Sequence, residues 1–374
     1  MKATSFAVAF IIKLTMKVFL LIFLLVSAAI TVWAQDTTST GKLTISGYAE
    51  LYYSYDFNKP ADHNRPPFVY SYNRHNEVNL NLGFIKAAYT NNNIRANLAL
   101  MAGTYTNANL AAESGVLKNI FEANAGIKLT KKADLWLDAG IFASHIGFES
   151  AIGKDCWVLT RGIVSDNTPY YEAGAKLTYT TPDGKLTATG LYLNGWQRIQ
   201  RIDGNNKPAG GLQLTWKPSS DLTFNYSNYL GSEGPDSVGV KRFYHNFYAI
   251  VQVTDKFGVT AGIDYGTQQI SKENHKTNHI ISPVAIARYQ LATKWAVAGR
   301  VEYYQDKNGI FISTGTPNGF KTTGYSLNVD YIPFPNAVIR IEGKTYSSKD
   351  EIFIKGNSLT TNSPLLTTSL AVSF

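Results

Sequence analysis

The sequence contains one cysteine, few charged residues and only one long apolar run. A lone Cys156 excludes a fold held together by intramolecular disulfides. Charged residues make up 17% of the chain, against an average of about 25% in soluble proteins. After residue 34 no apolar run approaches the length of about 18 residues that a membrane-spanning helix needs. If the rest of the chain crosses a membrane, it must therefore do so with strands.

The charge balance is mildly basic. The formal net charge is +8, and the first 34 residues contribute three lysines and no acid to it, so +5 remains without them. Nucleic-acid binding needs a clustered basic face, and no such cluster is visible. The charge therefore does not favour a nucleic-acid partner.

The N-terminus resembles a secretory signal peptide. Lys17 precedes the apolar run Val18–Val26, and small residues lead to Ala34. We expect cleavage after Ala34, which assigns residues 1–34 to a signal peptide and residues 35–42 to a periplasmic stub. Translation can start at Met1 or at Met16. A membrane-anchor helix is the less favoured alternative, because the apolar core is short.

From Leu43 to the last residue, the hydrophobic pattern has a period of two, which is the period of β-strands. The closing strand places alternate apolar residues, Leu366 to Phe374, on one face and small or polar residues on the other. The same reasoning places Leu82 and Phe84 on the apolar face of one strand and Phe121 on the apolar face of a later strand. The region Lys185–Gly195 is the least regular. About sixteen strands are predicted, with fourteen and eighteen as alternatives.

The connections alternate strictly between short turns and long polar loops. Short turns are predicted near Asn91, Lys131, Asp183, Pro218, Asp255, Thr293 and Phe334. Outer-membrane barrels have short periplasmic turns and long extracellular loops. We therefore predict an all-β fold over residues 43–374, a transmembrane antiparallel up-and-down β-barrel with its apolar faces toward lipid. A soluble sandwich or propeller is the alternative, but no 40-residue propeller repeat is visible.

A barrel of about sixteen strands leaves an aqueous channel. Its charged wall residues can set selectivity. The pore-lining candidates are Arg95, Glu122, Arg288, Arg300, Glu302, Asp330, Arg340, Glu342 and Lys344. The third long loop, His145 to Pro169, is the candidate constriction, and its charged residues are Glu149, Lys154, Asp155, Arg161 and Asp166. Wall charges that pair with one another only for stability, and an ordinary external loop, remain the alternatives.

Catalytic and metal signals are weak. Ser144, His145 and Glu149 are close in sequence, but no nucleophile elbow surrounds a serine. The histidines lack metal-ligand spacing. The sequence therefore predicts no enzyme, no metal and no cofactor.

Three segments resemble a known family. They are Gly47–Tyr53 (Gly-Tyr-Ala-Glu-Leu-Tyr-Tyr), Gly140–Glu149 (Gly-Ile-Phe-Ala-Ser-His-Ile-Gly-Phe-Glu) and Pro169–Gly174 (Pro-Tyr-Tyr-Glu-Ala-Gly). Together they resemble the putative β-barrel porin-2 (OmpL-like) family of Bacteroidetes-type outer membranes. The resemblance implies passive solute diffusion across the outer membrane, and it supplies no catalytic residues. By position, the third long loop follows the fifth strand, where general porins carry a loop that folds inward.

We therefore predict an exported porin of the Gram-negative outer membrane that passes small hydrophilic solutes and ions without a cofactor. Its partners would be outer-membrane lipid, the solutes and, as in many porins of this size, two further copies in a homotrimer. A non-conducting structural or adhesive barrel is the main alternative. An embedded hydrolase is the other.

Overall fold

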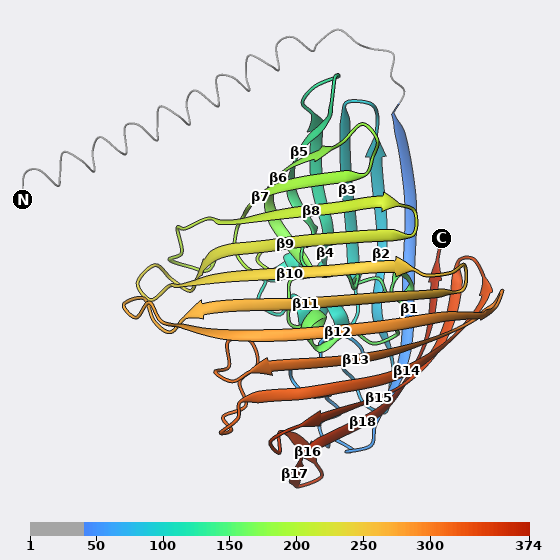
Figure 1. The fold of residues 1–374 in the computed structure, drawn as a ribbon, viewed down its shortest axis with the longest axis vertical. Helices are drawn as coiled ribbons and strands as arrows, with labels where there is room; N and C mark the ends of the chain where they lie inside the picture. Colours follow the sequence, from blue (N-terminus) through green and yellow to red (C-terminus); the bar gives the residue numbers. More distant parts are fainter. Residues whose placement is uncertain (1–40) are drawn as a thin grey trace, which may run out of the picture. The chain divides into compact units, whose positions relative to one another are not determined.

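The computed structural model describes residues 41–374, which form a closed β-barrel (Figure 1). Sixteen antiparallel strands follow one another around the ring in chain order. The strands are β1 (Lys42–Asp56), β2 (Val78–Thr90), β3 (Ile94–Ala102), β4 (Ile120–Lys128), β5 (Asp134–Ala143), β6 (Tyr171–Thr180), β7 (Leu186–Leu193), β8 (Ala209–Ser219), β9 (Leu222–Glu233), β10 (Val240–Gln252), β11 (Phe257–Gln269), β12 (Thr277–Ala292), β13 (Trp295–Asp306), β14 (Phe320–Phe334), β15 (Ala337–Ser348) and β18 (Asn362–Ser373). The predicted signal peptide and most of the predicted stub lie outside the described residues.

The first and last strands close the ring. β1 pairs with β18 from Tyr48 opposite Ser373 to Asp56 opposite Leu365. Closure removes both sheet edges, whose unpaired backbone groups would each cost several kcal/mol in hydrocarbon. The predicted antiparallel barrel of about sixteen strands is confirmed. Two further short strands, β16 (Phe353–Lys355) and β17 (Ser358–Thr360), form a separate hairpin in the last long loop.

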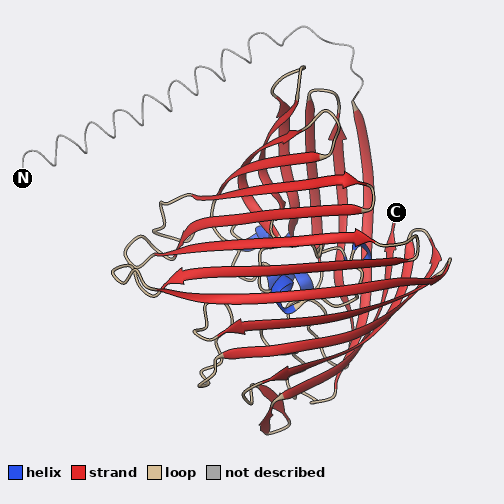
Figure 2. Cartoon of the chain, viewed as in Figure 1, coloured by secondary structure: helices blue, strands red, loops and turns tan. Residues whose placement is uncertain are grey.

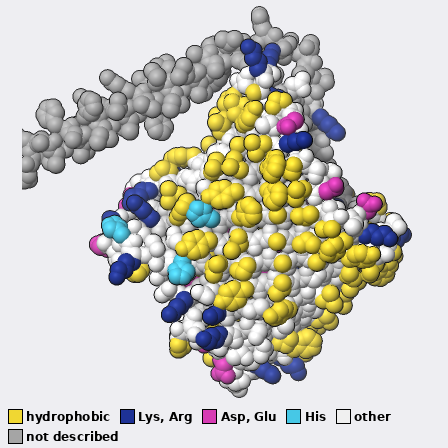
Figure 3. All heavy atoms as spheres, in the orientation of Figure 1, with side chains coloured by type: hydrophobic (Ala, Val, Ile, Leu, Met, Phe, Trp, Pro, Cys, Tyr) yellow, Lys and Arg dark blue, Asp and Glu magenta, His cyan; other side chains and the backbone are white. Residues whose placement is uncertain are grey.

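The strand pattern places apolar side chains outside and polar ones inside, as predicted. Leu327 is 66% exposed on the outer face of β14, and Val301 on the neighbouring β13 is also exposed. Arg300, one residue before Val301, is only 3% exposed on the inner face. Hydrophobic side chains cover much of the visible wall in Figure 3. Among the described residues, no helix is long and apolar enough to span a membrane.

Two parts of the predicted pattern are wrong in phase. Leu82 is fully buried, and Phe84 packs against the buried ring of Tyr48, so both face the interior. On β4 the pairing with β3 shifts between Ala99 and Leu100, because β4 carries an extra residue there. A β-bulge of this kind re-aims a side chain. It turns Phe121 inward, where its ring stacks on that of Phe84.

The long loops occupy much of the barrel interior. Short helices are drawn among the strands in Figure 2. They are α2 (Thr104–Asn109), η1 (Gly115–Asn119), η2 (Gly153–Asp155) and α3 (Ile163–Asp166). Three of them, α2, η2 and α3, contain buried residues. Two of them, η2 and α3, belong to the connection between β5 and β6, residues 144–170. The third long loop therefore follows the fifth strand, as predicted.

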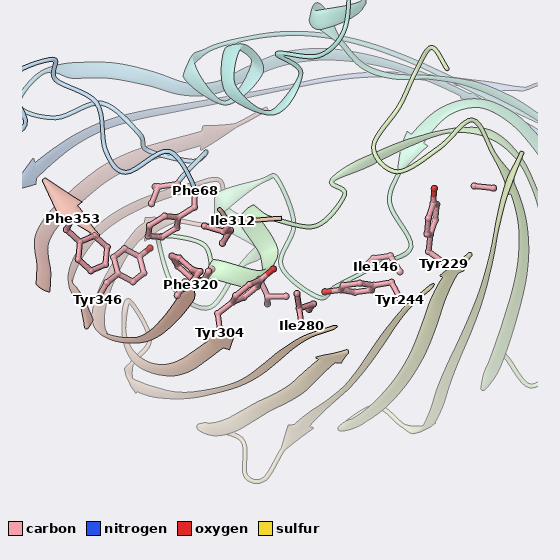
Figure 4. Packing of buried hydrophobic residues seen from close by; sticks show 14 of the residues in the cluster. Phe68, Ile146, Tyr229, Tyr244, Ile280, Tyr304, Ile312, Phe320, Tyr346 and Phe353 are labelled. Atoms are coloured by element: carbon pink, nitrogen blue, oxygen red, sulfur yellow. The ribbon is translucent and has the colours of Figure 1, made fainter. Parts of the chain in front are cut away.

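Part of the interior is dry, which differs from the expected water-filled lumen. Inward-facing tyrosines from four strands meet apolar side chains from the first, seventh and last long loops (Figure 4). The ring of Phe68 lies 4.8 Å from that of Phe320 and 5.4 Å from that of Tyr346. This apolar layer comprises Phe68, Tyr229, Tyr244, Ile280, Tyr304, Ile312, Phe320, Tyr346 and Phe353, among others. It packs the long loops against the inner faces of many strands, from β5 to β18.

Candidate functional site

The connection between β5 and β6 (residues 144–170, the inner loop from here on) is fixed to the barrel wall by Arg300 of β13. One guanidinium nitrogen of Arg300 lies 3.0 Å from Glu149 Oε1 and donates to the carbonyl of Thr160 at 2.8 Å. A second nitrogen donates to the Thr160 hydroxyl at 3.0 Å. Arg300 therefore holds two points of the inner loop at once.

Two carboxylates of the same wall accept hydrogen bonds from the backbone of the inner loop. Glu342 of β15 accepts from the amide and the hydroxyl of Thr160, the latter at 2.9 Å. Glu302 of β13 accepts from the amide of Ile163 at 2.6 Å. The Lys344 ammonium lies 2.8 Å from Glu302. A buried charge is costly unless it is paired and hydrogen-bonded, and these groups are both.

Arg340 of β15 makes a third attachment. Its guanidinium donates to the carbonyls of Gly153 and Cys156, each at 2.8 Å, and lies 3.1 Å from Asp330 of β14. Asn328, also on β14, accepts from the amide of Leu159 at 3.3 Å. The inner loop is therefore bound along β13, β14 and β15 rather than at one point.

Arg161 holds the inner loop together from within. It is fully buried and donates to the carbonyls of Ser150, Leu159 and Ala151 at 2.7, 2.7 and 3.2 Å. Asp166 instead joins the inner loop to the first long loop, because it accepts from the Ser71 hydroxyl at 2.9 Å. Burial raises the pKa of Asp166 to about 6.

The two remaining charged candidates of the inner loop lie nearer to water. Asp155 is exposed and Lys154 is half-buried. The amide of Lys154 donates to the Tyr48 hydroxyl of β1 at 3.3 Å, which fixes the backbone beside the exposed carboxylate. Of the five charged candidates of the inner loop, only these two are not buried.

The predicted wall residues separate into two groups. Arg300, Glu302, Asp330, Arg340, Glu342 and Lys344 are all buried beneath the inner loop on neighbouring strands. Arg288 lies at the margin of this group, 3.9 Å from Asp330 and partly exposed. Arg95 and Glu122, on β3 and β4, belong to a different part of the wall.

On that other part, the inner faces of β2 to β8, many polar side chains are partly exposed, although Asp138 and Glu172 are buried. Arg95 lies over the ring of Trp136 and pairs with Asp138 at 2.6 Å. Lys86 pairs with Glu122. The half-buried inward-facing residues, called the open wall from here on, are Lys86, Arg95, Asn97, Glu122, Asn124, Lys128, Lys176, Thr178, Thr187, Gln213 and Thr215.

Lys176 differs from the other cations of the open wall. Within residues 41–374, its ammonium forms no ion pair and lies 4.7 Å from the ring centre of Phe142. Lys86 is a residue that sequence reasoning missed, because the wrong phase for Leu82 and Phe84 put it on the lipid side. A lysine in an otherwise apolar strand was the feature of the sequence that could have indicated its inward direction.

The geometry offers no catalytic pair at the Ser144–His145 dipeptide. His145 is buried and its Nε2 lies 2.8 Å from the carbonyl of Asn228. Burial lowers the pKa of His145 to about 4, so the ring is neutral near pH 7 and Nε2–H donates. The Ser144 hydroxyl accepts from the amide of Ile146. In the described part of the chain, no group of three His, Cys, Asp or Glu residues could hold a metal ion.

A closed sixteen-stranded barrel with an internal loop and a polar open wall has the form of a membrane channel. The family model of the putative beta-barrel porin-2, OmpL-like proteins matches residues 42–374. The chain belongs to this porin family. The resemblance seen in the sequence is thereby confirmed, and membership agrees with an outer-membrane β-barrel that serves transport.

Solved structures with the same fold are also porins and outer-membrane channels. The anion-selective porin from Comamonas acidovorans aligns with a TM-score of 0.57 and 10% identity, over 90% of this chain and 100% of that one. OmpT of Vibrio cholerae, in its trimer form, aligns at 0.56 and 12%, over 90% and 100%. The channel DcaP of Acinetobacter baumannii aligns at 0.56 and 9%, over 89% and 97%. No curated protein matches the sequence. At these identities the similarities show the fold alone.

Proposed function

We propose that this porin is a passive diffusion channel for small hydrophilic solutes and ions, and that its aqueous path follows the open wall. One observation carries the proposal. Inward charges on β13 to β15 are buried under the inner loop, whereas the residues of the open wall on β2 to β8 remain partly exposed. A water-filled path that runs along the open wall, away from the wall covered by the inner loop, fits this difference.

The inner loop would narrow this path. Glu149, Arg161 and Asp166 would act by holding the loop in place, since all three are buried. Lys154 and Asp155 would be the charges that a passing ion meets. Among the wall candidates, Arg95 and Glu122 would line the path, together with Lys86 and Lys176.

Passive diffusion needs no cofactor and no catalytic residue, so we propose that the protein is not an enzyme. We also propose export through a signal peptide, residues 1–34, that is cleaved after Ala34, leaving residues 35–42 as a periplasmic stub. Assembly as a homotrimer is supported by the trimer form of one structural neighbour. It is also supported by small outward side chains on neighbouring strands, which allow close approach: Ala87, Ala96, Ala125, Ala139 and Ala175.

The first test is electrical. Purified protein in a planar lipid bilayer should give discrete conductance steps. Lys176→Glu should shift the reversal potential in a salt gradient toward cation preference, because it reverses a charge on the open wall.

Lys176→Arg is the matched control and should keep the wild-type reversal potential. The absence of steps in the wild-type protein would reject the pore in favour of a structural or adhesive barrel. If Lys176→Glu gives conductance steps with the wild-type reversal potential, the aqueous path does not run along β6.

A further inference from the structure

A cavity of about 400 Å³ lies where the inner loop faces the open wall. Its lining comes from β2 to β6 and β10 of the barrel, from α2, and from residues 144, 146–152, 169 and 170 of the inner loop. The volume falls within the range of small-molecule sites, about 300–1,000 Å³. The cavity thus lies beside the path that we propose for diffusing solutes.

Aromatic side chains line this cavity from different elements. Phe121, turned inward by the bulge in β4, stacks on Phe84 with ring centres 4.8 Å apart and planes 9° apart. Phe148 of the inner loop and Tyr248 of β10 form another pair with centres 5.5 Å apart. Phe121 and Phe148 pack against buried clusters, and one face of Phe121 is covered by Phe84, but Phe121, Phe148 and Tyr248 each stay partly exposed. The exposed part of each ring is available to a ligand.

One ion pair supplies the polar part of the lining. The side chains of Lys86 on β2 and Glu122 on β4 contact each other, and they are 28% and 18% exposed. The ammonium carries three donors, and the carboxylate carries two acceptor oxygens. Hydrogen bonds from neutral hydroxyls to charged groups are stronger than those between neutral groups. A hydroxyl-bearing ligand could therefore bond to both partners without adding a charge.

We propose that this cavity is a binding subsite for small sugars on the route through the channel. The inference rests on the proposed diffusion function and names the solute class that the path favours. A pyranose ring has an apolar C–H face that can stack on Phe121 and hydroxyls at its edge that can reach Lys86 and Glu122. A hydrated inorganic ion has no apolar face to stack on an aromatic ring. An open-chain polyol has the hydroxyls but no fixed apolar face.

The test compares glucose with sorbitol, which has a similar size and a similar set of hydroxyls but no ring. Ion current through single channels is recorded with each solute at matched concentrations. Glucose should interrupt the current in a concentration-dependent way, and sorbitol should not. Phe121→Leu should weaken the apparent glucose affinity by about threefold to tenfold, since aromatic stacking contributes of order 1 kcal/mol.

Phe247→Leu is the control, because it makes the same change on the outer face of β10. It should leave glucose binding unchanged. Phe148→Leu alters the inner loop rather than the sheet, and it should weaken glucose binding in the same way. It replaces Phe121→Leu in the test if that variant does not fold.

The outcomes separate the two proposals. Absence of current steps in the wild-type protein rejects the channel itself. Steps that glucose and sorbitol affect equally, or an unchanged glucose affinity in a folded Phe121→Leu or Phe148→Leu variant, overturn the sugar subsite and leave the channel standing.

Discussion

Replacing Arg300 with methionine is expected to destabilise the folded barrel by about 3–5 kcal/mol, because removing one partner of a buried ion pair leaves the other charge uncompensated. Glu149 and Glu342 both lose their contacts with this guanidinium, and Thr160 loses two hydrogen bonds. The inner loop should then detach from β13, which widens the path. Urea unfolding in lipid vesicles measures the first effect, and single-channel conductance, which should rise, measures the second.

Lys128→Met is the matched control, since it also removes a cation from an inward-facing position. Its partner Asp134 is 3.2 Å away, but both side chains are partly exposed. Exposed pairs contribute about 1 kcal/mol or less, so its stability should stay near that of the wild type. Adding Glu149→Gln to Arg300→Met should recover part of the lost stability, because it removes one of the buried negative charges left without a cation. Wild-type stability and conductance in Arg300→Met would show that the inner loop is held by other contacts.

The fold could be predicted because a lipid solvent imposes a simple rule on every strand. Side chains alternate between lipid and interior, and a shift of one residue would move the whole apolar set to the wrong side. Leu327 and Val301 follow this rule, and so does the closing strand that ends at Phe374. Turn length adds independent information, because short and long connections must emerge at opposite ends.

The errors arise where one local feature overrides the alternation. A bulge in β4 adds one residue and reverses the direction of Phe121. Nothing in the composition of that segment distinguishes a bulge from regular pairing. The same limit applies to Leu191 and Leu193, which break the pattern because their side chains contribute to the apolar layer inside the barrel.

The candidate site was predicted only at the level of which side chains face inward. Arg95 and Arg300 have the same signature in the sequence, an arginine between apolar residues of a strand. Arg95 is one-third exposed on the open wall, whereas Arg300 is buried by residues more than a hundred positions away. Long-range packing of the inner loop decides between these environments, and periodicity carries no information about it.

Two neighbouring residues of β8 provide the sharpest test of the barrel's orientation toward lipid. Leu214 is exposed on the outer face near the middle of the strand, and Gln213 belongs to the open wall on the inner face. Leu214→Arg should destabilise the folded barrel by about 2–4 kcal/mol, the cost of an arginine facing lipid near the bilayer midplane. Gln213→Arg places the same side chain on the inner face, where it replaces hydrogen bonds from Gln213 to the His145 carbonyl and to Asn225. Such bonds contribute about 1 kcal/mol each, so the loss of stability should be smaller than in Leu214→Arg, and the reversal potential should shift toward anion preference. Urea titration of folding in lipid vesicles compares the two variants directly. Equal losses of stability would mean that β8 does not separate lipid from water, and a larger loss in Gln213→Arg would mean that the interior at this level is dry.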